Sequence, residues 1–399
     1  MGDTDDGKTT LGAEFNLLVE PWIPVLLRDG RADRVGIRRA LTEAGMIRQI
    51  AASNPMDRVA LLRLLLAVLQ WCKPTPTDRE LASLREDGCA GIPEKWLDAK
   101  LGTPEAPNAA FELWPERGNG FLQTASRDKK ATEPPTYLLH EFPVGTNIAH
   151  FRHARDDAAT ICPACAALGL VRAPLFTTQG GSGKSPGIND KPPIYFVPTG
   201  LTLLDTLLLQ WPFEVVAYDR PAWERKPNRK PTDPVGVLEG FTWLPRRVRL
   251  QASRSTGGPC AVCSLTEDGG AFVTRIVFEG DPGSKKDEKS GLVWRDPHVA
   301  YPEPKSPKTD GVLRAANSLG MLGSALGQWR RLSTSALASE SDQARPPAAL
   351  QSAAKRARAA EYVEVEACGF ASDQMKYMEC WSRSLKLPLG DAMLDADRA

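Results

Sequence analysis

The order of apolar and polar residues along the chain predicts both strands and helices. The run from Phe15 to Leu27 is rich in branched and aromatic residues, which is typical of a strand. Pro21 and Pro24 interrupt it, and they belong at a strand edge or in a turn because proline cannot donate a ladder hydrogen bond. Arg28, Asp29 and Gly30 then predict a turn. Two later runs alternate enough to predict half-buried strands, at 241–250 and 271–278.

Residues 56–72 form an apolar segment that predicts a buried helix. We expect only four side chains in it to contact water: Asp57, Arg58, Arg63 and Gln70. Prolines end this helix, and Asp78 can cap a second, more polar helix that runs to about Leu84. Further helices are expected at 311–332 and 349–360. Strands and helices in this order predict an α+β fold class, built as a large mixed α/β domain.

The composition is that of an ordinary globular protein. The 399 residues are 42% hydrophobic and 25% charged, and they contain no run of 18 or more apolar residues that could span a bilayer. The polar, acidic N-terminus is unlike a signal peptide, so we expect a cytoplasmic protein with a disordered tail over residues 1–14. Fifty basic and 49 acidic residues give a formal charge of +1, so any contact with nucleic acid has to be local.

Four of the eight cysteines form two pairs, each with the two-residue gap that lets both thiolates reach one tetrahedral zinc ion. The pairs are Cys162 with Cys165, and Cys260 with Cys263. Together they predict a structural Cys₄ zinc site, since a complete thiolate shell leaves no open position for catalysis. Residues 166 to 259 separate the pairs, so the metal would join distant segments. The alternative is that these are reduced cysteines in turns.

A glycine-rich stretch at 177–187 contains Gly183-Lys184-Ser185, which suggests a phosphate-binding loop. The full pattern fails, because it requires a glycine where Thr178 stands and a helix where Pro186 and Gly187 follow. Glycines can instead let the backbone approach a nucleic acid closely, and a plain surface loop is the other alternative.

Three of the four histidines lie at 140–153, but no nucleophile signature accompanies them, so we predict polar contacts rather than catalysis.

Several of these segments resemble one family. The string Phe15-Asn16-Leu17-Leu18-Val19-Glu20-Pro21-Trp22-Ile23-Pro24-Val25 resembles the opening of the CasA-type large subunit of Cascade, the type I-E CRISPR surveillance complex of antiviral defence. The segments 145–151 and 368–377 resemble two further family motifs, and paired cysteines occur at comparable places in family members.

The resemblance implies a non-catalytic subunit that binds both DNA and RNA. It would read the protospacer-adjacent motif (PAM) through the minor groove of double-stranded target DNA, and it would start the unwinding needed for R-loop formation. It would also help to recruit a helicase-nuclease that acts in trans. Its other implied partners are the remaining Cascade subunits and the 5′ handle of the crRNA.

The resemblance also implies roles for particular residues. A glycine loop would lie in the minor groove (Gly180, Gly181 and Gly183, with Lys184 beside them), and a lysine finger would read the same groove (Lys285, Lys286 or Lys289, of which Lys289 is favoured). Gln374 would act as a wedge that opens the first base pairs. A further segment would contact the crRNA and a neighbouring subunit (Gly145, Thr146, Asn147, His150 and Phe151). If Gln374 is no wedge, Asp373 and Gln374 form a turn that caps the next helix.

The domain organisation follows from the same resemblance. We expect a large α/β domain with its zinc site over 15–367 and a hairpin with a short C-terminal remnant over 368–399. Family members normally continue into a helical bundle, which we expect to be a separate polypeptide, replaced or truncated here. Two other functions remain open: a zinc-stapled scaffold without DNA contact, and a nucleotide-binding enzyme that uses residues 180–185.

Overall fold

The computed structural model describes residues 14–115, 119–124, 132–139, 159–176, 187–189, 192–224, 233–254, 258–266, 270–280, 294–301, 346–356, 362–373 and 376–387. Within them the fold mixes helices with three small antiparallel sheets, which confirms the mixed α/β prediction. No helix among these residues has the length and apolar character needed to cross a membrane. The helix expected at 311–332 and the last four residues of the helix expected at 349–360 lie outside the described part of the chain.

The first sheet has the order β2-β1-β3, and β1 is its central strand. The strand predicted from Phe15 begins only at Ile23, so the prediction was wrong for 15–22. Pro21 lies in a bend, as expected, whereas Pro24 lies inside β1. The sheet tolerates Pro24 because the ladder with β3 starts one residue later, at Val25. The predicted turn joins β1 to β2, with Gly30 at a φ of 87°. The strands are β1 (Ile23–Leu27), β2 (Ala32–Val35) and β3 (Ile47–Ile50).

Helix α2 (Pro55–Cys72) runs through the core and confirms the predicted buried helix. Its N-terminus is capped by Asn54, whose side chain accepts a hydrogen bond from the Met56 amide at 2.9 Å. The prediction that its polar side chains contact water was wrong: Asp57, Arg63 and Gln70 are buried, and Arg58 is half-buried. Each forms an ion pair or a hydrogen bond with a residue from later in the chain, and these partners take the place of water.

Shorter helices surround α2. Thr77, rather than Asp78, is the N-cap of α3, since Thr77 and Glu80 form a reciprocal capping box. Residues 242–245 form a turn and irregular chain in place of the first half of the strand predicted at 241–250, and helix α7 ends just before them. The helix forms because both Asp219 carboxylate oxygens accept hydrogen bonds from its first backbone amides, at 2.8 Å each. The helices of this group are α1 (Ile37–Thr42), α3 (Asp78–Leu84), α4 (Glu94–Leu101), η1 (Ala109–Phe111), η2 (Pro135–Leu138), α6 (Leu203–Gln210) and α7 (Val237–Phe241).

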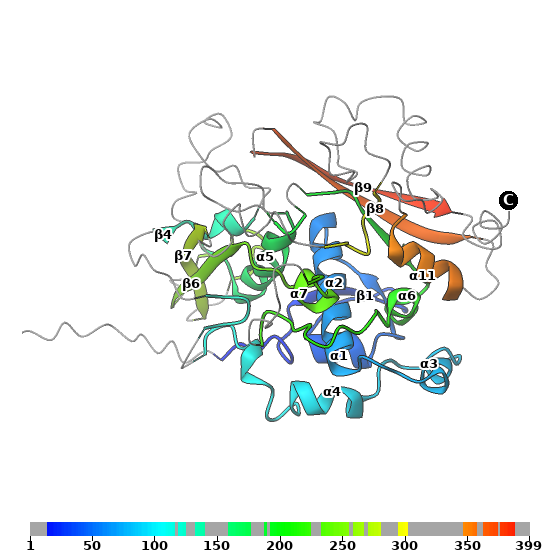
Figure 1. The fold of residues 1–399 in the computed structure, drawn as a ribbon. Helices are drawn as coiled ribbons and strands as arrows, with labels where there is room; N and C mark the ends of the chain where they lie inside the picture. The colour runs from blue at the N-terminus through cyan, green and yellow to red at the C-terminus, as the bar shows by residue number, and fades with distance from the viewer. Residues whose placement is uncertain are drawn as a thin grey trace, which may run out of the picture.

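The second sheet has the order β4-β7-β6 and lies beside helix α5 (Pro163–Phe176), at the left of Figure 1. Its strand β7 confirms the strand predicted at 271–278. Only the end of the strand predicted at 241–250 is extended, because β6 begins after Pro245. The strands are β4 (Thr132–Glu133), β6 (Arg246–Arg254) and β7 (Ala271–Gly280).

The third sheet has the order β5-β8-β9, and its long β8–β9 hairpin crosses the top of the molecule in Figure 1. A second, smaller core forms between this sheet and α11, with Phe196, Leu350 and Val365 among its buried residues. Helix α11 (Ala348–Arg356) confirms the described part of the helix predicted at 349–360. The strands are β5 (Tyr195–Thr199), β8 (Val363–Asp373) and β9 (Lys376–Leu387).

Candidate metal centre and nucleic-acid interface

The fold brings both cysteine pairs to one place, between α5 and the sheet β4-β7-β6. Cys162 directly precedes α5 and Cys165 lies in its first turn, while Cys260 and Cys263 lie on the connection between β6 and β7. Backbone hydrogen bonds hold the two segments together, from Ala261 to Thr160 at 2.9 Å and between Ile161 and Val273 in both directions. Pairing with the sheet therefore brings together two cysteine pairs that lie far apart in the sequence.

The sulfur geometry fits a tetrahedral metal site. All four Sγ atoms lie within 4.8 Å of one another, and the Cys162 and Cys263 Sγ atoms are 3.7 Å apart. A zinc ion with Zn–S bonds of about 2.3 Å requires sulfur separations of roughly 3.8 Å. These separations are far longer than a disulfide bond of about 2.05 Å, and all four cysteines are free. The residues can therefore hold one zinc ion in a complete thiolate shell.

The electrostatics of the cluster differ from one thiol to the next. Hydrogen bonds to Cys162 and Cys260, together with burial, raise the pKa of Cys165. The pKa of Cys260 is lowered because its sulfur accepts hydrogen bonds from both Cys162 and Cys165. The Cys162 backbone amide also points at the Cys260 sulfur, at 3.3 Å. Because zinc binds thiolates, loading the site must release protons.

The residues expected to contact DNA or RNA lie outside the described part of the chain. This holds for the glycine loop (Gly180, Gly181, Gly183, Lys184), for the candidate lysines (Lys285, Lys286, Lys289), for Gln374, and for the crRNA segment (Gly145, Thr146, Asn147, His150, Phe151). Their roles stay predictions. The structure does describe the chain that borders several of them.

Strands β8 and β9 form the hairpin that the motif at 368–377 predicted. The two strands pair from Val363 with Leu387 to Asp373 with Lys376, with one irregularity after Ala371. A strand, rather than a helix, follows Gln374 in the sequence, so the alternative in which Asp373 caps a helix was wrong. The connected end of the hairpin lies far from α11, as Figure 1 shows.

The middle of the hairpin is attached to the first turn of α2. The half-buried Arg58 side chain donates to the Glu366 carboxylate of β8, with an Nε–Oε1 distance of 3.1 Å, and to the Ser382 hydroxyl of β9 at 3.0 Å. Arg58 also donates to the Ala52 carbonyl at 3.0 Å. One guanidinium therefore links both strands of the hairpin to the first core.

A second buried polar cluster centres on Arg63 of α2, and sequence reasoning missed it. Arg63 donates two hydrogen bonds to Asp296, at 2.7 and 2.9 Å, and both side chains are at most 1% exposed. The Arg63 guanidinium also lies over the Phe241 ring, 4.0 Å from its centroid. Burial alone would raise the pKa of Asp296, but the Arg63 charge outweighs it and holds that pKa below its usual value.

His298 completes this cluster as a neutral imidazole. Burial lowers its pKa to about 3. Its Nδ1 lies 3.0 Å from Arg63, which can only donate, so the proton resides on Nε2, which donates to Gln210 Oε1 at 2.5 Å. The only sequence signal for this cluster was an arginine inside an apolar helix, and nothing in the sequence identified its partner.

The cluster extends to a fourth segment of the chain. Asn189 donates to Asp296 Oδ2 at 2.8 Å and accepts a hydrogen bond from the Trp294 indole N–H at 2.9 Å. Asn189 follows the glycine-rich stretch by a few residues, and Trp294 follows the lysine segment in the same way. The described residues that border the two predicted DNA-contacting stretches are thus bonded to one another.

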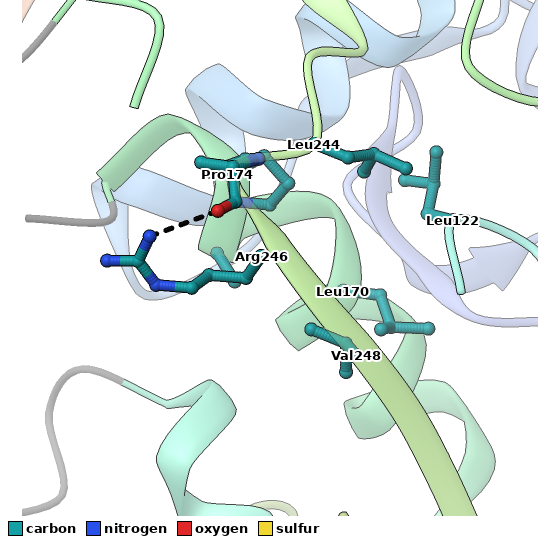
Figure 2. Close-up of a pocket in the computed structure, with 8 residues that line it drawn as sticks. Leu122, Leu170, Pro174, Leu244, Arg246 and Val248 are labelled. Carbon is teal, nitrogen blue, oxygen red and sulfur yellow. Dashed lines mark hydrogen bonds between the residues drawn. The ribbon is translucent and has the colours of Figure 1, made fainter. Parts of the chain in front are cut away.

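A pocket between α5 and β6 carries no comparable chemistry. Its interior of about 10 Å³ has room for roughly one water molecule. Its lining is apolar except for Arg246, whose guanidinium points away from Leu122 and Leu244 in Figure 2. Arg246 donates to the Pro245 carbonyl at 3.0 Å, and burial lowers its pKa to about 10. We assign this pocket to packing.

The structure of the segment after residues 180–185 does not fit the alternative that this loop binds a nucleotide. Gly187 to Asn189 form a bridge and a turn, and the next described element is the strand β5. A phosphate-binding loop would lead directly into a helix, whose N-terminal amides hold the phosphates. Within the described residues no helix begins between this loop and β5.

Comparison with solved structures defines the class of fold. Over 97% of this chain and 76% of the other, the structure aligns with the crystal structure of Thermobifida fusca Cse1, with a TM-score of 0.72 and 21% identity. A chain of a structure titled "CRISPR RNA-guided surveillance complex" aligns over 94% of this chain and 76% of that one, with a TM-score of 0.66 and 18% identity. The mixed α/β fold is therefore that of Cse1 proteins.

Sequence comparison identifies the family itself. The sequence model described as "CRISPR-associated protein Cse1" matches residues 16–399. A CasA/Cse1 protein of Thermus thermophilus is 34% identical over 269 residues, which cover 59% of this chain and 49% of that protein. The chain belongs to the Cse1 family, the CasA-type large subunits of type I-E Cascade. It spans about half the length of this Thermus relative.

Proposed function

We propose that this chain is a non-catalytic large subunit of a type I-E Cascade that recognises the PAM in target DNA. The observation that carries the proposal is the family match over residues 16–399. The paired β8–β9 hairpin around Gln374 supports it. The proposed partners are the other Cascade subunits, the crRNA 5′ handle, double-stranded target DNA and a helicase-nuclease that acts in trans, all in the cytoplasm.

In this proposal Gly180, Gly181 and Gly183 bring backbone amides close to the minor groove, where no Cβ stands in the way. Lys184 and one of the lysines at 285–289 reach the O2 and N3 acceptors of A·T pairs, a degenerate code that accepts several motif sequences. Residues 145–151 contact the crRNA and the neighbouring subunit. The division into a large domain over 15–367 and a hairpin region over 368–399 belongs to the same proposal.

Gln374 is the proposed wedge. A side chain inserted into the base stack costs a few kcal/mol per unstacked step, which binding to the motif has to offset. A wedge also has to be mounted on a rigid part of the protein. The Arg58 hydrogen bonds to both β8 and β9 supply such a support from the core helix α2.

The zinc ion has a structural role in the proposal. Cys162, Cys165, Cys260 and Cys263 would hold it, and it would supply only a rigid link between the start of α5 and the β6–β7 connection. No step of DNA recognition passes through the metal.

The test of the proposal compares Cascade reconstituted with and without this chain. Binding is measured on duplexes that differ only in the bases flanking the guide-matched target. Discrimination between flanks should depend on the chain. If discrimination survives without it, the family match describes the fold and the PAM is read elsewhere.

The wedge has a sharper test in Gln374→Ala. We expect motif-dependent binding to persist while R-loop formation on linear duplex slows by at least tenfold, because only the unstacking step is affected. A target whose first base pairs are already unpaired is the control and should restore the normal rate. Unchanged R-loop formation on the intact duplex would remove the wedge role from Gln374.

The second candidate function is a zinc-stapled scaffold without DNA contact, which the clustered cysteines favour. A scaffold would need all four cysteines but tolerate changes at Gly181 and Gln374. The flank-discrimination assay separates the two functions.

A further inference from the structure

The two chain segments that border the proposed minor-groove stretches meet in one hydrogen-bonded node. We use this name for Asn189, Trp294, Asp296 and Arg63. Asn189 both accepts from the Trp294 indole and donates to the Asp296 carboxylate, so its amide joins the two segments through two different atoms. Because the amide oxygen and nitrogen are both used, the Asn189 side chain has one orientation in the node.

The node is attached to the most deeply buried part of the fold. Asp296 is held by Arg63 of α2 and by the Tyr301 hydroxyl, which accepts from the Asp296 amide at 2.8 Å. Trp294 packs directly on Gly240 of α7, where an added Cβ would come within 2.1 Å of the indole ring. The position of Trp294 is therefore fixed by packing as well as by its hydrogen bond.

A rigid connection is useful if the glycine stretch and the lysine stretch both enter the same minor groove. The minor groove of B-DNA is about 6 Å wide, so two protein segments that enter it together tolerate little displacement relative to each other. Two separately attached loops would have to lose that freedom on binding. A fixed connection between their bordering residues removes part of this cost before DNA arrives.

We propose that Asn189 and Trp294 are positioning residues for PAM reading: their hydrogen bond holds the segments that follow the glycine stretch and the lysine stretch in one fixed arrangement. This inference rests on the proposed function. In this inference Asn189 and Trp294 do not touch DNA, and they act by fixing the two DNA-contacting stretches relative to each other.

The test uses Trp294→Phe, which stays aromatic but removes the indole N–H together with the far ring atoms that pack on Gly240. In purified, fully assembled Cascade, the ratio of affinities for duplexes with matched and mismatched flanks should fall by roughly 3- to 10-fold, the value of one lost hydrogen bond. Affinity for a target with its flank-proximal pairs already separated should not change. A purely structural role would lower the yield of complex or its melting temperature but leave this ratio intact.

Asn189→Ala is the second variant and should reduce the same ratio. Adding Trp294→Phe to Asn189→Ala should lower the ratio by less than Trp294→Phe does alone, since the hydrogen bond is already absent. The matched control is Trp71→Phe, which removes another indole hydrogen bond, to Glu224 at 2.9 Å, and should leave the ratio unchanged.

The outcomes separate this inference from the proposed function. If the unmodified complex shows no flank discrimination, the proposed function fails. If it discriminates and both variants discriminate equally well, the positioning role is overturned while the proposed function stands. Failure of both variants to assemble would show that the node serves folding alone, which also overturns the inference.

Discussion

His298 shows how burial decides the chemistry of a single side chain. It is the one histidine within the described residues, and it lies in the core, where it serves as a neutral hydrogen-bonding group. A protonated imidazole would bring a second positive charge next to Arg63 at a fully buried position. The structure therefore stabilises the unprotonated form over a wide pH range.

The consequence is a specific pH dependence of stability. The pKa of His298 is about 3 in the folded protein, below its ordinary value of 6.5. Because the folded pKa is depressed, the contribution is complete above pH 6.5 and is lost as the pH falls from 6.5 towards 3. The slope approaches about 1.4 kcal/mol per pH unit, since the unfolded chain takes up one more proton.

Urea unfolding between pH 7 and pH 4.5 measures this slope, and His298→Gln should remove it. The variant is expected to be less stable at pH 7 and less sensitive to acid. An unchanged slope in His298→Gln would mean that other groups cause the acid sensitivity.

At the scale of elements, the β8–β9 hairpin depends on one glycine. Gly369 of β8 lies opposite Trp381 of β9, and a Cβ at Gly369 would come within 2.2 Å of the indole ring. The ring thus packs flat across the neighbouring strand in space that a side chain would otherwise occupy. Glycine usually weakens a strand, but here it creates the contact that the hairpin needs.

We expect Gly369→Ala to destabilise the hairpin by about 1–3 kcal/mol, because Trp381 has to move away from the new methyl group. Hydrogen exchange of the β8 and β9 amides measures this local stability. Gly258→Ala is the matched control, since no atom lies within 4 Å of a Cβ added there. Equal protection in both variants would contradict this account of the packing.

The sequence predicted elements best where the signal was local. Helix α2 and strand β7 follow from their apolar patterns, and the clustering of the four cysteines follows from their paired spacing. Helix α7 could not be predicted, because its cap comes from Asp219, far upstream. The Arg63 cluster was missed for the same reason: its members come from α2, α6 and the segment 294–301, and only the fold brings them together.

The whole molecule is held together by a few links between distant segments. The three sheets share no strand within the described residues, and helix α2 contacts β3 of the first sheet and both β8 and β9 of the third. The cysteine cluster adds a link of another kind, between residues 98 positions apart. A metal there would stabilise the junction of α5 with the sheet β4-β7-β6.

We expect one zinc ion per chain, measured by metal analysis of purified protein. Cys263→Ser should lose the metal and lower the melting temperature by several degrees, since a three-thiolate site holds zinc less tightly. Cys89→Ser is the control and should retain it, because Cys89 lies outside the cluster. Protein that is well folded with four free thiols and no metal would support the alternative of reduced cysteines in turns.

The central position of α2 has a consequence for how the protein is made. Its two arginines find their acidic partners 233 and 308 residues later in the chain. At about 5–20 residues per second, a ribosome needs roughly 15–60 s to deliver Glu366 after Arg58 has been synthesised. During that time an apolar helix with two unmatched charges is without its final neighbours. We therefore expect the nascent chain to bind holding chaperones. A shortage of these chaperones should reduce the yield of new protein without affecting protein that has already folded.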